Sequence, residues 1–407
     1  MTTFADLGLA SALEKALAAE GYETPTPIQA KAIPIVAAGS DLLGIAQTGT
    51  GKTAAFALPI LHRLAQNRRA PAHKGCRALI LSPTRELATQ IADSFRAYGR
   101  FTDLRVAVIF GGVAHRPQIQ AIGAGVDILV ATPGRLLDHV SERNLTLGST
   151  EIFVLDEADQ MLDLGFVKPI RKIVSMLPGR RQNLFFSATM PHEIGALAAE
   201  LLVEPKKVEI TPAATTVERI SQKVIHVEHA KKRALLVELL GDAAMSRALV
   251  FTRTKRGADR VSDHLEKAGI TAAAIHGNKS QQQRNRALAS FKAGGVRVLV
   301  ATDIAARGID IDLVSHVVNY ELPEVPEQYV HRIGRTARAG ADGIAISLCD
   351  GEERSLLRDI ERLTRQQIPH EDRRNDASLA ASPKGEPRAA TGEARREHRK
   401  GQYRGDG

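Results

Sequence analysis

Short apolar runs alternate with stretches of helical periodicity along most of this chain, and no other feature constrains its fold as strongly. The runs lack the polar/apolar alternation of a half-exposed sheet, so we expect parallel strands covered by helices on both faces. The first set of expected strands is 41–46, 77–82, 106–110, 127–131, 152–156, 183–187 and 207–210. The pattern then restarts at 223–227, 248–252, 271–275, 296–301, 316–319 and 344–348. The sequence therefore predicts an α/β protein with two tandem, doubly wound parallel-sheet domains.

The spacing of the two patterned regions predicts the domain organisation. A chain of 407 residues is too long for one compact core and fits two domains with a tail. Residues 211–217 are small and polar and include a proline, as expected of a linker. Residues 369–407 have almost no large hydrophobic side chains, which predicts a disordered, polar and basic tail. The expected units are an N-terminal segment and two domains, at 1–32, 33–210 and 218–368.

Composition narrows the choice of partner and compartment. A formal charge of +9 and a pI near 9.6 favour a polyanionic partner such as nucleic acid. Aromatic residues make up 4% and tryptophan is absent, so base stacking on an aromatic platform is not expected. No apolar run approaches the roughly 18 residues that cross a bilayer and no secretory signal is visible, so a cytoplasmic location without a membrane partner is expected. Cys76 and Cys349 are isolated, which supports neither a disulfide framework nor a zinc site.

A glycine-rich segment between the first expected strand and the next helix is typical of a nucleotide-binding loop. It consists of Ala46, Gln47, Thr48, Gly49, Thr50, Gly51, Lys52 and Thr53, with alanine where the general pattern has glycine. Small residues let backbone N–H groups surround phosphate oxygens, and the helix N-terminus adds positive potential. Lys52 would reach the β- and γ-phosphates and Thr53 would face Mg²⁺. A chance glycine-rich turn is the weaker alternative in this strand–loop–helix setting.

A nucleotide-binding loop of this kind needs an acidic partner, and one follows the expected strand at 152–156. Asp156 would lie at the carboxyl tip of that strand, where ligands of open α/β sheets bind. It can hold Mg²⁺, while Glu157 can orient and deprotonate the attacking water. An acidic helix cap, which Asp159 would also satisfy, is the alternative.

With Asp156-Glu157-Ala158-Asp159 the chain resembles the DEAD-box RNA helicases, and more narrowly the bacterial RhlE-type members. The similarity extends from Phe4 to about residue 365. It implies two RecA-like domains that close around ATP, Mg²⁺ and single-stranded RNA.

The segment 21–29 is similar to the Q motif of that family. The resemblance implies that Gln29 reads the edge of the adenine and that Phe4 and Tyr22 sandwich the base. A side-chain amide can donate and accept at once, which suits adenine, so ATP is expected rather than GTP. Without the other motifs, a proline-rich turn with a surface glutamine would be preferred.

The resemblance also implies roles for residues at the ends of other strands. RNA-binding residues would be Pro83, Thr84, Arg85, Gly112, Thr132, Pro133 and Arg135 in the first domain and Arg253, Gly277, Thr302 and Arg307 in the second. Such contacts to the RNA backbone carry little sequence information. Coupling of hydrolysis to strand separation would involve Ser187, Thr189 and His331. Ordinary turns or polar strand ends are the alternatives.

An arginine-rich run at 331–338 would complete the nucleotide site from the second domain. If the run is helical, Arg332, Arg335 and Arg338 recur at i+3 spacing and share one broad face. The resemblance makes Arg335 and Arg338 arginine fingers for the γ-phosphate. It also places Gly308 and Asp310 near the nucleotide. A solvated basic helix face is the alternative.

The expected function is therefore RNA-stimulated ATP hydrolysis that unwinds short RNA duplexes or remodels RNA–protein complexes. Its catalytic residues would be Lys52, Asp156, Glu157, Arg335 and Arg338. An ATP-gated RNA clamp and a DNA helicase are the alternatives. Ribosomal or RNA-decay proteins are candidate partners, whereas the identity of the RNA and the oligomeric state are not indicated.

Overall fold

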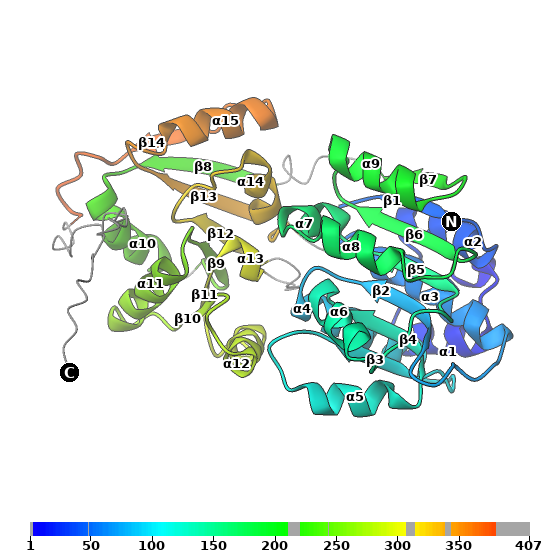
Figure 1. Cartoon of the computed structure of the whole chain (residues 1–407). Helices are drawn as coiled ribbons and strands as arrows, with labels where there is room; N and C mark the ends of the chain where they lie inside the picture. Colours follow the sequence, from blue (N-terminus) through cyan, green and yellow to red (C-terminus); the bar gives the residue numbers. More distant parts are fainter. Residues whose placement is uncertain are drawn as a thin grey trace, which may run out of the picture.

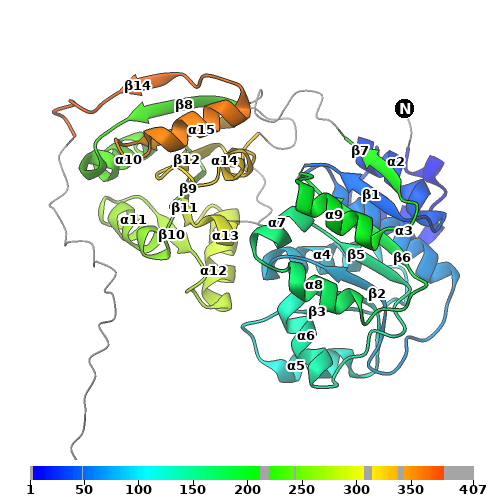
Figure 2. The same cartoon turned by 45° about the horizontal axis from the view of Figure 1, so that its top comes forward.

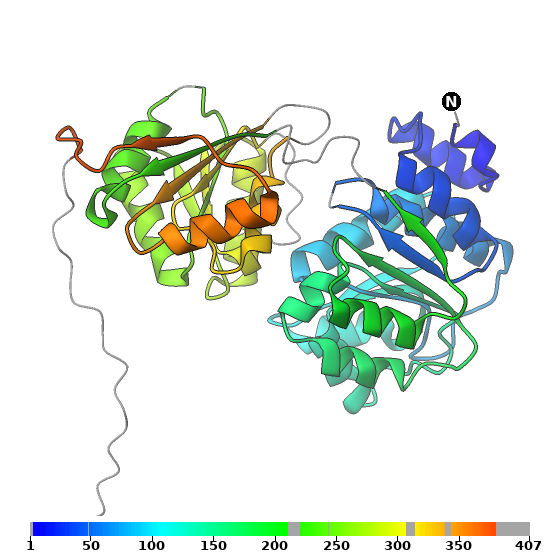
Figure 3. The ribbon, with the colours of Figure 1, turned by 90° about the horizontal axis from the view of Figure 1, so that it is seen from above.

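Two domains, each built around one parallel sheet, lie side by side in the computed structural model (Figures 1 and 3). The structure describes residues 3–47, 49–210, 220–242, 244–306, 314–337 and 343–379. We refer to 3–210 as the first domain and to 220–379 as the second. The predicted α/β class with two tandem RecA-like domains is confirmed. The expected linker at 211–217 lies outside the described residues, as does the tail from residue 380 on.

The first domain contains a seven-stranded sheet in the order β3-β4-β2-β5-β6-β1-β7, with neighbouring strands parallel. Most of its strand residues are fully buried, as expected for apolar runs covered on both faces. The strands are β1 (Leu42–Ile45), β2 (Cys76–Leu81), β3 (Val106–Ile109), β4 (Val126–Ala131), β5 (Ile152–Leu155), β6 (Gln182–Ser187) and β7 (Lys206–Glu209).

Helices cover both faces of this sheet (Figure 2). One core packs a 3-10 helix and four α-helices on one face: η1 (Ala5–Leu7), α1 (Ser11–Ala19), α2 (Pro27–Ala37), α3 (Lys52–Gln66) and α4 (Arg85–Tyr98). The opposite core contains α5 (His115–Gly123), α6 (Pro133–Ser141), α7 (Ala158–Asp163), α8 (Val167–Val174) and α9 (His192–Leu201). Alternate residues of the inner strands enter the two cores, because strand side chains point to opposite faces.

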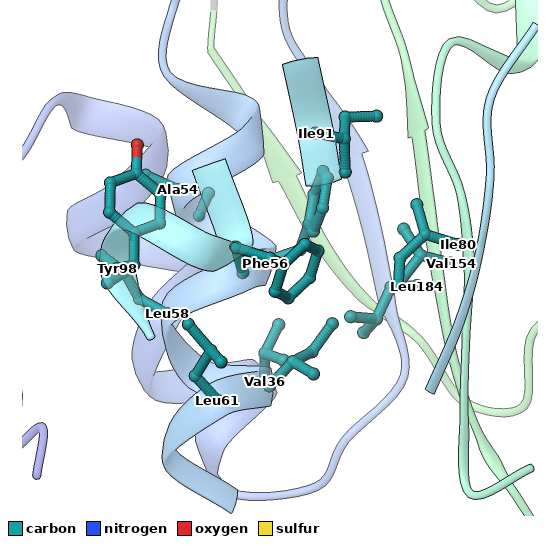
Figure 4. Close-up of a cluster of buried hydrophobic side chains, with 14 of the residues drawn as sticks. Val36, Ala54, Phe56, Leu58, Leu61, Ile80, Ile91, Tyr98, Val154 and Leu184 are labelled. Carbon is teal, nitrogen blue, oxygen red and sulfur yellow. The ribbon is translucent and has the colours of Figure 1, made fainter. Parts of the chain in front are cut away.

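Aromatic and aliphatic packing fixes α3 against the sheet. Phe56 of α3 lies between Phe95 of α4 and Phe186 of β6, with ring centroids 6.1 and 5.4 Å away. Val154 and Leu184 face the same cluster from the sheet (Figure 4). This contact positions the N-terminus of α3, where the glycine-rich loop ends.

The second domain repeats the strand order of the first, as β10-β11-β9-β12-β13-β8-β14. Neighbouring strands are again parallel. They are β8 (Ile220–His226), β9 (Ala248–Phe251), β10 (Ala272–Ile275), β11 (Val298–Ala301), β12 (His316–Asn319), β13 (Gly343–Cys349) and β14 (His370–Asp372). The helical elements are η2 (His229–Lys231), α10 (Lys232–Leu240), α11 (Lys255–Lys267), α12 (Gln281–Lys292), α13 (Asp303–Ala306), α14 (Pro326–Ile333) and α15 (Arg354–Thr364).

The expected start of the tail at residue 369 is wrong. Residues 370–372 form β14, which pairs with the edge strand β8 and takes the position that β7 has in the first sheet. Leu379 is 4% exposed and belongs to the core between the sheet and α10 and α11. The ordered domain therefore extends past 368 to at least 379. Among the described residues, no helix has the length and apolar character needed to cross a membrane.

The correction at the end of the second domain can be tested with Leu379→Ala. Removing this buried side chain should lower the free energy of unfolding by about 2–5 kcal/mol. Chemical denaturation followed by circular dichroism measures the change, with Leu363→Ala, at a 42% exposed position, as the control. Equal stability of the two variants would mean that residues beyond 372 do not belong to the core.

Candidate active site

The glycine-rich loop joins β1 to α3 and places Lys52 at the first position of that helix. Gly49 and Gly51 have φ values of +82° and +92°, a left-handed conformation that favours glycine. The Lys52 side chain is buried, and its Nζ donates a 2.9 Å hydrogen bond to the carbonyl of Ala46. Thr50 Oγ1 donates to the carbonyl of Gln47 at 2.7 Å. The ammonium group and the helix N-terminus thus lie together in an arrangement that suits phosphate oxygens.

Gln29 connects helix α2 to this loop. Its Oε1 accepts a 2.9 Å hydrogen bond from the backbone N–H of Thr26, and its Nε2 donates to the Gly51 carbonyl at 3.2 Å. A Cβ at position 51 would lie 2.4 Å from Nε2, so Gly51 permits the contact. Gln29 is 2% exposed. These contacts use one acceptor position and one donor of its amide, which leaves a second lone pair and a second N–H for an adenine.

The aromatic rings of Phe4 and Tyr22 do not form the expected sandwich. Their centroids are 6.3 Å apart and their planes meet at 84°, an edge-to-face contact. Tyr22 also packs edge to face on Tyr98, and the two hydroxyl groups are 3.4 Å apart. A base held between two rings needs parallel planes, so the sandwich would require these rings to turn, and it stays a prediction.

Two buried carboxylates follow β5. Asp156 and Glu157 are 2% and 3% exposed, and burial raises the pKa of both carboxyl groups while the charge of Lys52 opposes the rise. Glu157 has a φ of +55°, an unfavourable conformation for a residue with a side chain. Glu157 Oε2 is buried without a hydrogen-bond partner among the described residues. Such an oxygen is suited to a ligand or a water brought by one.

Oxygen atoms at this site fit Mg²⁺. The carboxylate of Asp156 lies at the tip of β5, and the hydroxyl of Thr53 belongs to the first turn of α3. Carboxylate and hydroxyl oxygens are the donors that Mg²⁺ takes alongside substrate phosphates. Thr48, also expected in the nucleotide site, lies outside the described residues.

Asp159 performs a role that sequence reasoning did not assign. Its Oδ2 accepts hydrogen bonds from the backbone N–H groups of Ala188 and Thr189, at 3.2 and 2.9 Å, and from Thr189 Oγ1 at 3.0 Å. Ser187 Oγ donates to the Thr189 carbonyl at 2.7 Å. The segment after β6 is therefore attached to the helix that follows Asp156 and Glu157. A third carboxylate, two residues after Glu157, was the available signal.

Arg335 brings positive charge from the second domain to these carboxylates. It is 5% exposed, and its charge lowers the pKa of Glu157, against the larger effect of burial. A cavity of about 230 Å³ lies between the domains and is lined by Gln47, Ala188, Thr189, Glu327, Val330, His331, Gly334, Arg335 and Leu363. The structure thus brings Arg335 and His331 to the first domain. Arg338, Gly308 and Asp310 lie outside the described residues.

The expectation that three arginines share one helix face is wrong. Helix α14 ends at Ile333, so Arg335 lies beyond it. Arg332 is 1% exposed and points into the second domain, where its Nη2 donates to Asp303 Oδ2 at 2.7 Å and its Nη1 to the Glu321 carbonyl at 2.6 Å. Arg332 is therefore structural. Ala337 has a φ of +56°, the left-handed conformation in which glycine would be unstrained.

Three loops of the first domain that were expected to bind RNA lie together beyond β2, β3 and β4. The guanidinium of Arg85 packs over Gly112, where a Cβ would lie 2.2 Å from Arg85 Nη1. Arg135 donates through both Nη atoms to the carbonyl of Val113, at 3.1 and 3.2 Å. The other expected RNA-binding residues of this domain lie where helices begin. Pro83 precedes α4 and Thr84 is its N-cap, whereas Thr132 is the N-cap of α6 and Pro133 its first residue.

Residues of the second domain that were expected to bind RNA lie at the ends of its strands. Arg253 follows β9 and forms ion pairs with Glu321 and Glu353, at 3.9 and 3.4 Å. Gly277 follows β10 with the Lys255 side chain above it, and Thr302 precedes α13. Arg307 lies outside the described residues.

A direct contact joins the two domains next to the loops that were expected to bind RNA. Glu86 of α4 forms a 3.0 Å ion pair with Arg284 of α12 and accepts a 3.0 Å hydrogen bond from Gln281. Gln281 also accepts a bond from Arg85, at 3.4 Å. Helix N-termini of both domains are thereby held together.

Replacing Glu157 with glutamine tests the raised pKa of its carboxyl group. Between the ordinary pKa of 4.5 and the raised folded-state pKa, the folded chain binds the proton more often than the unfolded chain. The unfolding free energy of the wild type should therefore fall as pH rises through this window. Glu157→Gln lacks that loss, so its free energy of unfolding near pH 8 should exceed that of the wild type by at least about 1 kcal/mol. One pKa unit corresponds to about 1.4 kcal/mol.

Denaturation between about pH 5 and pH 8 measures this difference, with Glu193→Gln at an exposed position as the control. Parallel curves for Glu157→Gln and the wild type would contradict a carboxyl group held in a desolvated site.

Family models match both domains of this chain. The DEAD/DEAH box helicase family model matches residues 26–197, and that of the helicase conserved C-terminal domain matches residues 231–340. The DEAD-box ATP-dependent RNA helicase CshA of Bacillus subtilis is 42% identical over 384 residues, covering 94% of this chain and 76% of that protein. CshA of Geobacillus kaustophilus is also 42% identical, over 390 residues, covering 96% and 82%.

Solved structures of other proteins are also similar to this chain. S. cerevisiae Dbp5 bound to RNA and ADP BeF3 has a TM-score of 0.80 at 32% identity, covering 91% of this chain and 96% of that chain. A DEAD box protein from the hyperthermophile Methanococcus jannaschii has a TM-score of 0.53 at 39% identity, covering 91% and 99%. The narrower RhlE-type resemblance stays a prediction. The chain belongs to the DEAD-box family of ATP-dependent RNA helicases.

Proposed function

We propose that this chain hydrolyses ATP between its two domains and uses the cycle to separate short RNA duplexes or remodel RNA–protein complexes. The observation that carries the proposal is the approach of Arg335, from the second domain, to the buried carboxylate of Glu157 in the first. The cavity beside them has walls from both domains. A site divided in this way is complete only when the domains meet, so hydrolysis depends on closure.

The first domain supplies the residues that would bind the nucleotide and activate the attacking water. Lys52 and the N-terminus of α3 would hold the β- and γ-phosphates, which carry the negative charge of the substrate. Asp156 and Thr53 would hold Mg²⁺, which when bound neutralises phosphate charge. Glu157 would orient the attacking water and take its proton, and the raised pKa of its carboxyl group makes it a stronger base than an exposed glutamate. Arg335 would stabilise charge on the transferring phosphoryl group.

Single-stranded RNA would run across the neighbouring loops of both domains. Arg85, whose guanidinium packs over Gly112, would pair with an RNA phosphate, and Arg135 would do so by exchanging its hydrogen bonds to the Val113 carbonyl. Thr302 and Gly277 would continue the path on the second domain. The net charge of +9 favours such a polyanion whatever its sequence.

Asp159 offers a route from hydrolysis to RNA. It holds the backbone of Ala188 and Thr189, and both of these residues line the interdomain cavity together with His331. A change at the catalytic carboxylates would therefore reach the domain interface through hydrogen bonds that are already formed. A cytoplasmic location and partners from ribosome assembly or RNA decay stay predictions from the sequence.

ATP and RNA should each favour the closed arrangement and so raise the affinity for the other. The contact of Glu86 with Arg284 lies beside the RNA loops and holds the domains together there. The likeness to Dbp5 bound to RNA and ADP BeF3, scored over both domains, supports a similar placement of the domains in this chain.

Arg335→Ala should reduce RNA-stimulated ATP turnover by about 10³-fold or more, because arginine fingers contribute on that scale. Binding of ATP, measured with a fluorescent analogue, should be largely kept since the phosphate loop is intact. Arg362→Ala, at a position 79% exposed on α15, is the matched control and should behave as the wild type. Normal turnover in Arg335→Ala would contradict the finger role.

The choice of nucleic acid is tested with RNA and DNA strands of equal length and sequence. RNA should stimulate ATP turnover and DNA should not, because 2′-hydroxyl contacts distinguish the two. Lys52→Ala provides the background rate. Separation of a short RNA duplex is then compared with the lifetime of the complex on a single strand. Equal stimulation by DNA would favour a DNA helicase, and a long lifetime without duplex separation would favour an ATP-gated clamp.

A further inference from the structure

Two histidines and a glutamate converge on the first domain where α5 begins and α6 ends. The imidazole nitrogens of His115 and His139 and a carboxylate oxygen of Glu142 all lie within 4.8 Å of one another. The two rings have centroids 5.1 Å apart. None of the three residues lines the interdomain cavity or belongs to the nucleotide or RNA sites described above.

The local fold explains how the three side chains meet. His139 and Glu142 are three residues apart at the end of α6, so they project from the same side of that helix. His115 is the first residue of α5, and its Nδ1 lies 3.6 Å from Glu142 Oε2. Arg135 holds α6 to Val113, two residues before His115, and so fixes the ends of the two helices relative to one another.

His139 is the unusual member of the cluster. It is fully buried, and neither ring nitrogen has a hydrogen-bond partner among the described residues. A neutral imidazole carries one donor and one acceptor, and buried polar groups are normally satisfied. Burial also lowers the pKa of His139, which keeps the ring neutral with a lone pair available. An imidazole in this state is a ready ligand for a metal ion.

The charges around the cluster are mixed. Glu142 and Asp138 are acidic, whereas Arg135 is basic and its Nε lies 3.6 Å from Asp138 Oδ2. Asn144 Nδ2 donates to Glu142 Oε2 at 2.9 Å, which orients the carboxylate. The C-terminal end of α6 favours a cation, while the N-terminal end of α5 opposes one. Glu142 therefore supplies the ligand charge that a cation needs here.

We propose that His115, His139 and Glu142 bind a divalent transition-metal ion of the Zn²⁺ class. Two imidazole nitrogens and one carboxylate oxygen suit zinc and its neighbours better than Mg²⁺ or Ca²⁺, which prefer oxygen alone. Ligand bonds of about 2.0–2.2 Å place donor atoms about 3.4 Å apart, so small rotations of the half-buried His115 and exposed Glu142 close the site. The ion would tie α5 to α6 and leave one coordination position for water.

Calorimetric titration with Zn²⁺ tests the proposal on the full chain, after removal of metals with a chelator and in the presence of excess Mg²⁺ to occupy the catalytic carboxylates. The wild type should bind one ion per chain at this site. His115→Ala and Glu142→Gln should each weaken that binding by about tenfold or more. His73→Ala, an exposed histidine of the same domain, should leave it unchanged.

Co²⁺ gives a second readout, because its visible absorption reports nitrogen ligation in a four-coordinate site. The spectrum should appear with the wild type and with His73→Ala and be lost with His115→Ala. Melting curves recorded without metal must coincide for all variants. If His115→Ala melts early, His115→Asn takes its place. Unchanged Zn²⁺ affinity in His115→Ala and Glu142→Gln, or a Co²⁺ spectrum without nitrogen ligation, would overturn the proposal and leave His139 as a buried histidine packed on His115.

Discussion

The proposed nucleotide site is divided between two domains, and the rest of the structure depends on that division. Lys52, Asp156 and Glu157 belong to the first domain, whereas Arg335 comes from the second. A carboxylate buried without opposite charge is unfavourable, as the raised pKa of Glu157 indicates. Lys52 provides part of that charge from within the domain and Arg335 provides more from across the interface. Electrostatics therefore favours the approach of the two domains, and ligands that bind between them would favour the same closed arrangement.

Much of the fold could be predicted because the parallel strands are short apolar runs, and strand ends differ from the expectation by up to three residues. The strand β14 was missed for a physical reason. Its residues, His370, Glu371 and Asp372, form a polar edge held by backbone hydrogen bonds to β8, and no hydrophobic pattern marks such a strand. The buried Leu379 stands alone in a polar segment, so its contact with the core is visible only in three dimensions.

Local motifs located the glycine-rich loop and the carboxylates, since their chemistry depends on neighbours in sequence. The direction in which side chains point was harder to predict from the sequence. The period of the arginine run suggested one face, but α14 ends at Ile333, which buries Arg332 and leaves Arg335 at the interface. Likewise, the hydrogen bonds of Asp159 and the convergence of His115 with His139 join residues from separate elements. Contacts of this kind are set by packing and leave little signal in the sequence.

The central claim is that Arg335 completes a nucleotide site that begins on the other domain. The most direct measurement is a structure of the full chain with a non-hydrolysable ATP analogue, Mg²⁺ and an oligoribonucleotide. We expect the guanidinium of Arg335 at about 3 Å from a γ-phosphate oxygen, with Lys52 on the opposite side of the phosphates. A guanidinium directed into solvent, with the phosphates held by the first domain alone, would contradict the account.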